Sequence, residues 1–165
     1  MSDLVDSLTG SASPSILRER INWLLRRRVE DQQAFGILYL DISNFAQTNL
    51  EYGVSVGDSI LVIAADRMRS CVRPSDLVGR LGNDDFQLIF NDRMSKVSDL
   101  GALVARVVAS INDAYDVAGL TIDIHFDAAA LLIGSPHPLL EEIQRRADDG
   151  IALAKLESRV LIEPF

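Results

Sequence analysis

The chain has 165 residues, of which 48% are hydrophobic and 24% charged, a composition typical of one folded domain and not of a disordered or fibrous chain. Its formal net charge of −8 would repel nucleic acid, and no apolar run approaches the ~18 residues that a membrane-spanning helix requires. The single cysteine excludes an internal disulfide. We therefore expect one cytoplasmic domain over residues 1–165, with no nucleic-acid partner and no membrane contact of its own.

The first half of the chain predicts two helices around a buried strand. Ser13-Pro14 is typical of a helix start, and an apolar stripe continues to about Val29. Residues 35–40 form an almost continuous apolar run that ends at Asp41, which indicates a central strand buried on both faces. Apolar positions then recur at helical spacing over residues 56–72.

The second half predicts strands that follow one another directly. Two short apolar runs, 77–81 and 86–90, flank a loop of turn-forming residues and indicate a hairpin. A second amphipathic helix follows over 100–111, and residues 122–127 alternate as in a half-exposed strand. A third helix from Pro138 to about Leu156 and a short strand over 160–162 complete the order. The fold class is therefore mixed α/β with an antiparallel element.

Three carboxylates fall at element ends that folding could bring to one edge of the sheet. Asp41 closes the first strand, and Asp84 and Asp85 lie in the hairpin loop. Mg²⁺ takes one or two protein carboxylates and completes its shell with water and substrate phosphates, so this arrangement would favour nucleotide chemistry. The alternative is that acids in turns are merely solvated.

Several short segments resemble the GGDEF domain family, in the family's order, across almost the whole chain. They match the family's D-x-L-T-G opening, its D-x-D-x-F strand end, its R-x-G-G-D-E-F signature and its late A-D/A-K helix. The segments are Asp6–Gly10, Leu40–Phe45, Asn49, Tyr52-Gly53, Gly57-Asp58, Arg80–Phe86, Ala147-Asp148 and Ala154-Lys155. The resemblance implies a nucleotide-cyclase-like α+β fold, with helices around a largely antiparallel, mixed sheet of about five strands.

The resemblance also implies a site for GTP and Mg²⁺. In active members two GTP molecules become cyclic di-GMP, and two copies of the domain pair as an antiparallel homodimer because each supplies half of the reaction. The implied roles are metal binding by Asp41 and Asp84, catalysis by Asp84 and Asp85, guanine recognition by Asn49 and Asp58, and phosphate binding by Lys155 and Arg159.

A second implied site is the family's R-x-x-D inhibitory site for cyclic di-GMP, which Arg73 and Asp76 match at the expected distance before the signature. Arginine bonds a guanine edge bidentately, and aspartate accepts from its N–H groups. An ordinary turn that ends a helix would also contain such residues, and this alternative stays open.

The signature itself departs from the family. Asn83 stands for its second glycine, where a side chain would occupy ligand space, and Asp85 stands for its glutamate with a shorter reach. Ser43 replaces the second acid of D-x-D. These changes predict impaired catalysis.

We therefore expect a regulatory module in cyclic di-GMP signalling that binds cyclic di-GMP or GTP, cut from a longer protein with other signalling domains. One alternative is an active diguanylate cyclase. The other is a dimerisation or docking domain that binds no nucleotide.

Overall fold

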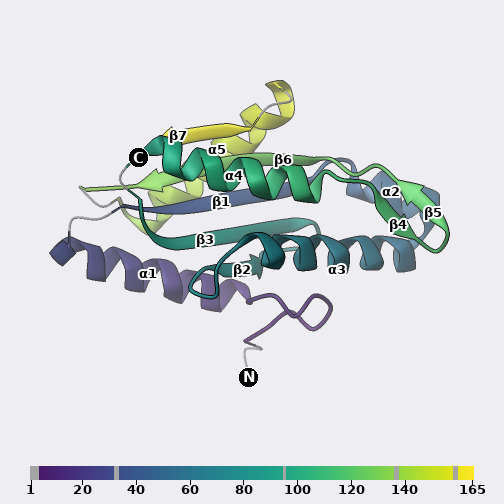
Figure 1. The fold of residues 1–165 in the computed structure, drawn as a ribbon, viewed down its shortest axis with the longest axis horizontal. Helices are drawn as coiled ribbons and strands as arrows, with labels where there is room; N and C mark the ends of the chain where they lie inside the picture. The colour runs from purple at the N-terminus through teal and green to yellow at the C-terminus, as the bar shows by residue number, and fades with distance from the viewer. Residues whose placement is uncertain (1–3, 32–33, 95, 136–137, 158–159) are drawn as a thin grey trace.

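The computed structural model describes residues 4–31, 34–94, 96–135, 138–157 and 160–165 (Figure 1). The helices are α1 (Pro14–Asp31), α2 (Phe45–Tyr52), α3 (Val54–Cys71), α4 (Val97–Ile111) and α5 (Leu140–Glu157). The strands are β1 (Ala34–Ile42), β2 (Leu77–Arg80), β3 (Asp85–Met94), β4 (Tyr115–Val117), β5 (Leu120–Ile122), β6 (Phe126–Ile133) and β7 (Leu161–Pro164).

Five of these strands form one sheet in the order β2-β3-β1-β6-β7, and β4 pairs with β5 in a separate hairpin. β1 is antiparallel to both β3 and β6, β2 is antiparallel to β3, and only β6 and β7 are parallel. β1 is the central strand of the sheet and is covered by helices on both faces, which explains why its residues form an almost continuous apolar run. The expected mixed, largely antiparallel sheet of about five strands is confirmed.

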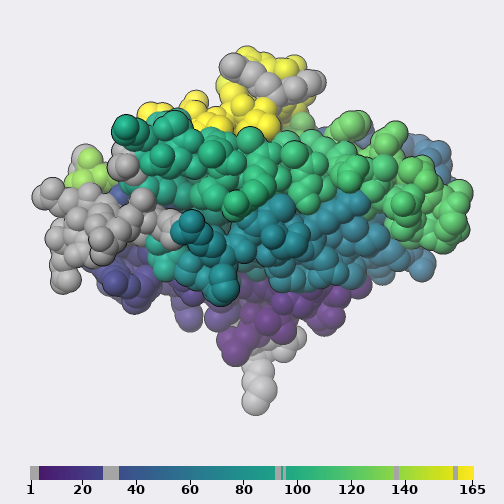
Figure 2. All heavy atoms as spheres, viewed as in Figure 1, coloured from purple at the N-terminus to yellow at the C-terminus, as the bar shows by residue number. Residues whose placement is uncertain are grey.

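Alternate residues of the sheet pack into two separate cores. Leu38 and Leu40 of β1 face α3 and α4, whereas Phe35 and Ile37 face α1 and α5. On the surface seen in Figure 2, α4 covers the middle of the molecule and the β4–β5 hairpin forms one end. None of the described helices combines the length and the apolar composition of a membrane-spanning segment.

Two differences from the sequence-based expectation lie near the carboxyl end of β1. The short helix α2 was not expected; it begins after Asn44, whose left-handed φ of 57° turns the chain sharply away from β1. The strand expected over 122–127 is interrupted, because the backbone leaves β5 after Ile122 and β6 begins only at Phe126. There the Ser43 N–H donates to the His125 carbonyl, and the Phe126 N–H donates to Asn112 Oδ1, so this stretch bonds to neighbouring loops instead of forming one continuous strand.

The N-terminal segment lies against the outer strand of the sheet. Ala12 forms a parallel bridge with Gly79 of β2, and Asp6 accepts hydrogen bonds from both the N–H and the hydroxyl of Thr9, which closes the preceding turn. Gly79 is required here, because a Cβ would stand 2.5 Å from the Leu17 side chain of α1. The N-terminal segment that contains the motif Asp6–Gly10 thus packs against β2, the strand that precedes the signature loop.

Candidate functional site

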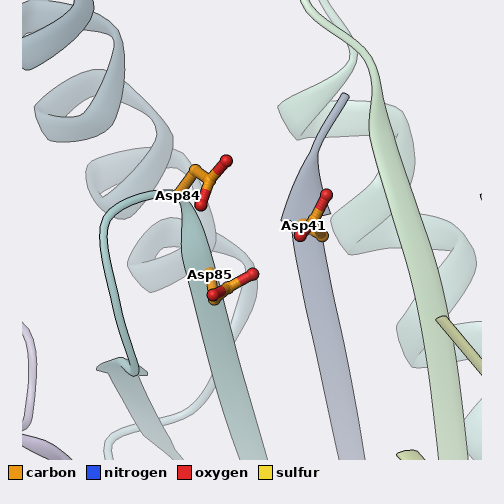
Figure 3. Close-up of side chains that lie close together, drawn as sticks. All are labelled: Asp41, Asp84 and Asp85. Carbon is orange, nitrogen blue, oxygen red and sulfur yellow. The ribbon is translucent and has the colours of Figure 1, made fainter. Parts of the chain in front are cut away.

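Strand register brings the three predicted carboxylates together. Asp41, near the end of β1, is the direct partner of Asp85, the first residue of β3, and Asp84 precedes it in the loop. The Ile42 N–H also donates to the Asp84 carbonyl at 3.1 Å, which holds the loop against β1. Each carboxylate offers an oxygen within 4.8 Å of the others, and Figure 3 shows the Asp85 side chain directed from β3 toward β1.

The electrostatics of this cluster favour a bound cation. Partial burial, together with a hydrogen bond to Asp41 and the charges of Asp41 and Asp84, raises the pKa of Asp85 to about 7. Burial and the charge of Asp41 also raise the pKa of Asp84. Partly buried like charges that cannot all ionise are stabilised by a hard cation, and carboxylate oxygens are the ligands that Mg²⁺ prefers. The residues therefore fit the ion that the sequence suggested.

Lys155 of α5 supplies one cation to the cluster. Its Nζ lies 2.9 Å from Asp41 Oδ1, and this hydrogen bond raises the pKa of Lys155. The lysine is 48% exposed, so its side chain has room to leave Asp41 for another anion. Arg159, expected beside it, lies outside the described residues.

Arg80 holds the signature loop through two contacts. Its Nη1 donates to both carboxylate oxygens of Asp6 at 3.2 Å, and its Nη2 donates to the Asn83 carbonyl at 2.8 Å. Neither Gly82 nor Asn83 adopts a positive φ, so asparagine causes no backbone strain in this loop. The replacement of the family's second glycine by Asn83 therefore acts through the exposed asparagine side chain and not through the backbone.

The two residues expected at guanine, Asn49 and Asp58, lie on α2 and α3, two helices that pack against each other. The Asn49 side chain lies against Gly57, the residue before Asp58, so closely that a Cβ at Gly57 would overlap Asn49 Oδ1. That oxygen is buried and has no hydrogen-bond partner. Such an orphan acceptor is rare in folded proteins, and a ligand could reach it only if the Asn49 side chain turned away from Gly57.

Asp76 of the second predicted site closes a turn. Its Oδ2 accepts from the Arg73 N–H at 3.0 Å, and its Oδ1 accepts from the Asn91 N–H at 2.9 Å. A cavity of about 540 Å³ lies beside this turn and is lined by Arg69, Arg73 and Asp76 among others. The contacts agree with the alternative of a structural turn, and the adjoining cavity leaves space for a ligand.

Sequence reasoning missed Asp127 as a neighbour of the cluster. It lies opposite Asp41 on β6, and its Oδ2 accepts a hydrogen bond from Ser43 Oγ at 2.8 Å. Ser43 occupies the position of an acid in the family. Here it supplies a hydroxyl that donates to Asp127 and no carboxylate. Predicting this neighbour from the sequence requires the register of β6 against β1. That register could not be derived, because the strand expected over 122–127 is interrupted before β6 begins.

Comparison with known proteins identifies relatives of the whole domain. The family model described as diguanylate cyclase, GGDEF domain, matches residues 3–160. The bifunctional diguanylate cyclase/cyclic di-GMP phosphodiesterase MucR of Pseudomonas aeruginosa is 28% identical over 156 residues, 94% of this chain and 22% of MucR. The diguanylate cyclase TpbB of the same species is 30% identical over 171 residues, 96% of this chain and 39% of TpbB. The chain thus spans less than two fifths of either relative.

Solved structures show the same fold. The GGDEF domain of TpbB superposes with a TM-score of 0.89 at 25% identity, covering 97% of this chain and 93% of that one. The P. aeruginosa diguanylate cyclase SiaD, solved with its activator SiaC, superposes with a TM-score of 0.88 at 26% identity, covering 99% of this chain and 62% of SiaD. The family resemblance of the motifs is thereby confirmed, and the chain belongs to the GGDEF domain family.

Proposed function

We propose that this GGDEF domain binds GTP with Mg²⁺ as a regulatory module of cyclic di-GMP signalling and that it forms cyclic di-GMP only slowly. The observation that carries the proposal is the cluster of Asp41, Asp84 and Asp85 with Lys155 beside it. Three acids against one lysine leave negative charge that a metal ion and its bound nucleotide would balance. A purely structural relic has no need for such a charged arrangement.

Each group of residues has a separate task in this proposal. Asp41 and Asp84 hold the metal, which when bound supplies charge stabilisation for phosphoryl transfer. Lys155 moves from Asp41 to the terminal phosphates. Asn49 offers its unpartnered amide oxygen to the donors of the guanine edge, and Asp58 accepts from the same edge.

Three changes around the cluster explain why turnover would be slow. The Asn83 side chain projects from the loop where the family has glycine, and Asp85 is one methylene shorter than glutamate. Displacement of a catalytic group by ~1 Å can cost about a hundredfold in rate. Ser43 binds Asp127 and supplies no carboxylate. A homodimer is required for any residual reaction, because each copy binds one of the two GTP molecules.

Titration calorimetry with GTP and Mg²⁺ tests the binding. We expect micromolar affinity for the wild-type domain and loss of binding in Asp84→Ala. Asp149→Asn, which removes an exposed carboxylate from α5, is the matched control and should bind like wild type. No heat of binding in the wild type would contradict the proposal and favour a nucleotide-free docking role.

A second candidate is cyclic di-GMP binding at Arg73 and Asp76, favoured by the adjoining cavity of about 540 Å³. The Arg73 guanidinium would donate two hydrogen bonds to a guanine edge, while Asp76 continues to accept the hydrogen bond that closes the turn. This candidate predicts cyclic di-GMP affinity that is lost in Arg73→Ala and unchanged in Asp84→Ala. The opposite pattern would place the dinucleotide at the carboxylate cluster instead.

A further inference from the structure

A cavity of about 570 Å³ lies between α1 and α5 on the sheet face that carries Asp41 and Asp85. This α1–α5 cavity has apolar walls, formed by Leu17 and Ile21 on one helix and by Ala147 and Ile151 on the other. Its volume falls in the range of small-molecule sites, which are mostly apolar with a few converging polar groups.

Two polar side chains form the floor of the α1–α5 cavity. Tyr39 of β1 and Gln87 of β3 are register partners, and they are only 9% and 3% exposed. On the same face the neighbouring residues Ile37 and Ile89 are buried apolar side chains. The glutamine interrupts the apolar run Phe86–Phe90 of β3. A hydrocarbon side chain at this buried position would not have to give up hydrogen bonds to water.

The Tyr39 hydroxyl is buried beside the Gln87 carboxamide, yet the two groups do not reach the geometry of a full hydrogen bond. A phenol keeps its proton at neutral pH, so the hydroxyl is a hydrogen-bond donor. Buried polar groups are normally paired, and an unpaired one that lines a cavity is explained by a ligand that supplies the partner. The carboxamide adds a second donor and a second acceptor on the same floor.

The charged residues that line the cavity limit what it can hold. Asp41, Asp85 and Lys155 form one charged group in the lining, and Arg18 and Asp148, both exposed, add one charge each. Three acids against two bases disfavour an anion, while apolar walls disfavour a strongly hydrated cation. Two helices facing each other across a polar floor suit a flat ring whose edge bears hydrogen-bonding groups.

We propose that the α1–α5 cavity binds an uncharged heteroaromatic molecule of one or two fused rings whose edge carries an adjacent N–H donor and carbonyl acceptor. The Gln87 carboxamide pairs with that edge, and the Tyr39 hydroxyl donates to the carbonyl. This site is distinct from the proposed nucleotide site in its floor and walls, because Asp84, Asn49 and Asp58 are not among its lining residues. Among the described residues, the two sites share Asp41, Asp85 and Lys155.

The test uses isoquinolin-1(2H)-one as the probe and its N-methyl derivative as a control that lacks the donor. Amide chemical shifts of the ¹⁵N-labelled domain are followed during titration. We expect shifts on β1, β3 and α5, with affinity at least tenfold weaker for the N-methyl derivative, as loss of one buried hydrogen bond implies. Gln87→Met and Tyr39→Phe should each lower the affinity for the probe by a similar factor.

A blocking variant separates cavity binding from other effects. Ala152 lines the cavity yet is exposed on α5, so Ala152→Phe fills the space without disturbing the core and should abolish binding. Ala105→Phe on the exposed face of α4, which packs on the opposite side of the sheet, is the matched control and should bind normally. Asp84→Ala should bind the probe with unchanged affinity, because Asp84 does not line the cavity. Loss of GTP binding can therefore be distinguished from loss of probe binding. Equal binding to Ala152→Phe and wild type, or no shifts with millimolar probe, would overturn the proposal.

Discussion

Replacing Asp85 by asparagine should make the stability of the domain less dependent on pH. The folded pKa of Asp85 is raised to about 7 from an ordinary value of 3.8. A carboxyl with a raised folded pKa contributes stability that is fully present below its unfolded pKa and is lost as pH rises through the folded pKa. The wild-type domain therefore loses stability between about pH 4 and about pH 7, and Asp85→Asn removes this contribution.

The size of the effect follows from the interval. From about pH 5 to the folded pKa of about 7 there are two pH units. Each corresponds to about 1.36 kcal/mol, which gives ~2.7 kcal/mol without screening. The carboxyl is only partly buried, so solvent screening reduces the expected difference to about 1 kcal/mol. Lys155, whose pKa is raised, stays charged across this interval and adds nothing to the slope.

Urea denaturation with EDTA at about pH 5 and about pH 8 measures this difference. Between the two pH values the wild type should lose about 1 kcal/mol more unfolding free energy than Asp85→Asn, with equal m-values. Asp149→Asn on the exposed side of α5 is the matched control and should follow the wild type. An Asp85→Asn variant whose stability changes with pH as much as that of the wild type would refute the reasoning.

Two further predictions concern residues that support the site. Gly57→Ala places a Cβ where the Asn49 amide oxygen lies, so calorimetry should show GTP affinity falling about tenfold or more. Gly101→Ala on α4, where the added Cβ would make only ordinary contact, should leave that affinity unchanged. Arg80→Ala removes the bonds that join the N-terminal turn to the signature loop, and urea denaturation should show about 1–3 kcal/mol less stability. Unchanged stability in this variant would mean that the hydrogen bonds of Arg80 do not stabilise the signature loop.

The sequence predicted the carboxylate cluster well, because strand ends and hairpin loops are local features. Asp41 ends an apolar run, and Asp84 and Asp85 lie between two others, so one antiparallel pairing is enough to join them. The contact of Lys155 with Asp41 was not foreseen, since it depends on how α5 crosses the sheet. The two cores follow from the same alternation of residues that predicted the strands.

Other features depend on long-range packing that no local pattern carries. Helix α2 begins only because Asn44 takes a left-handed conformation, which the sequence allows without requiring it. The unpartnered hydroxyl of Tyr39 becomes visible only when Gln87 is placed opposite it on β3. A glutamine within the apolar run 86–90 was the one available signal, and its meaning depended on the register.

The rate of cyclic di-GMP formation from GTP and Mg²⁺, compared between the wild type and the double variant Asn83→Gly/Asp85→Glu, tests the central claim most directly. Restoring the family signature should raise the rate at least tenfold while GTP affinity changes little, because the metal and guanine residues remain in place. A wild-type domain that forms cyclic di-GMP as fast as the double variant would contradict the claim that its signature impairs catalysis.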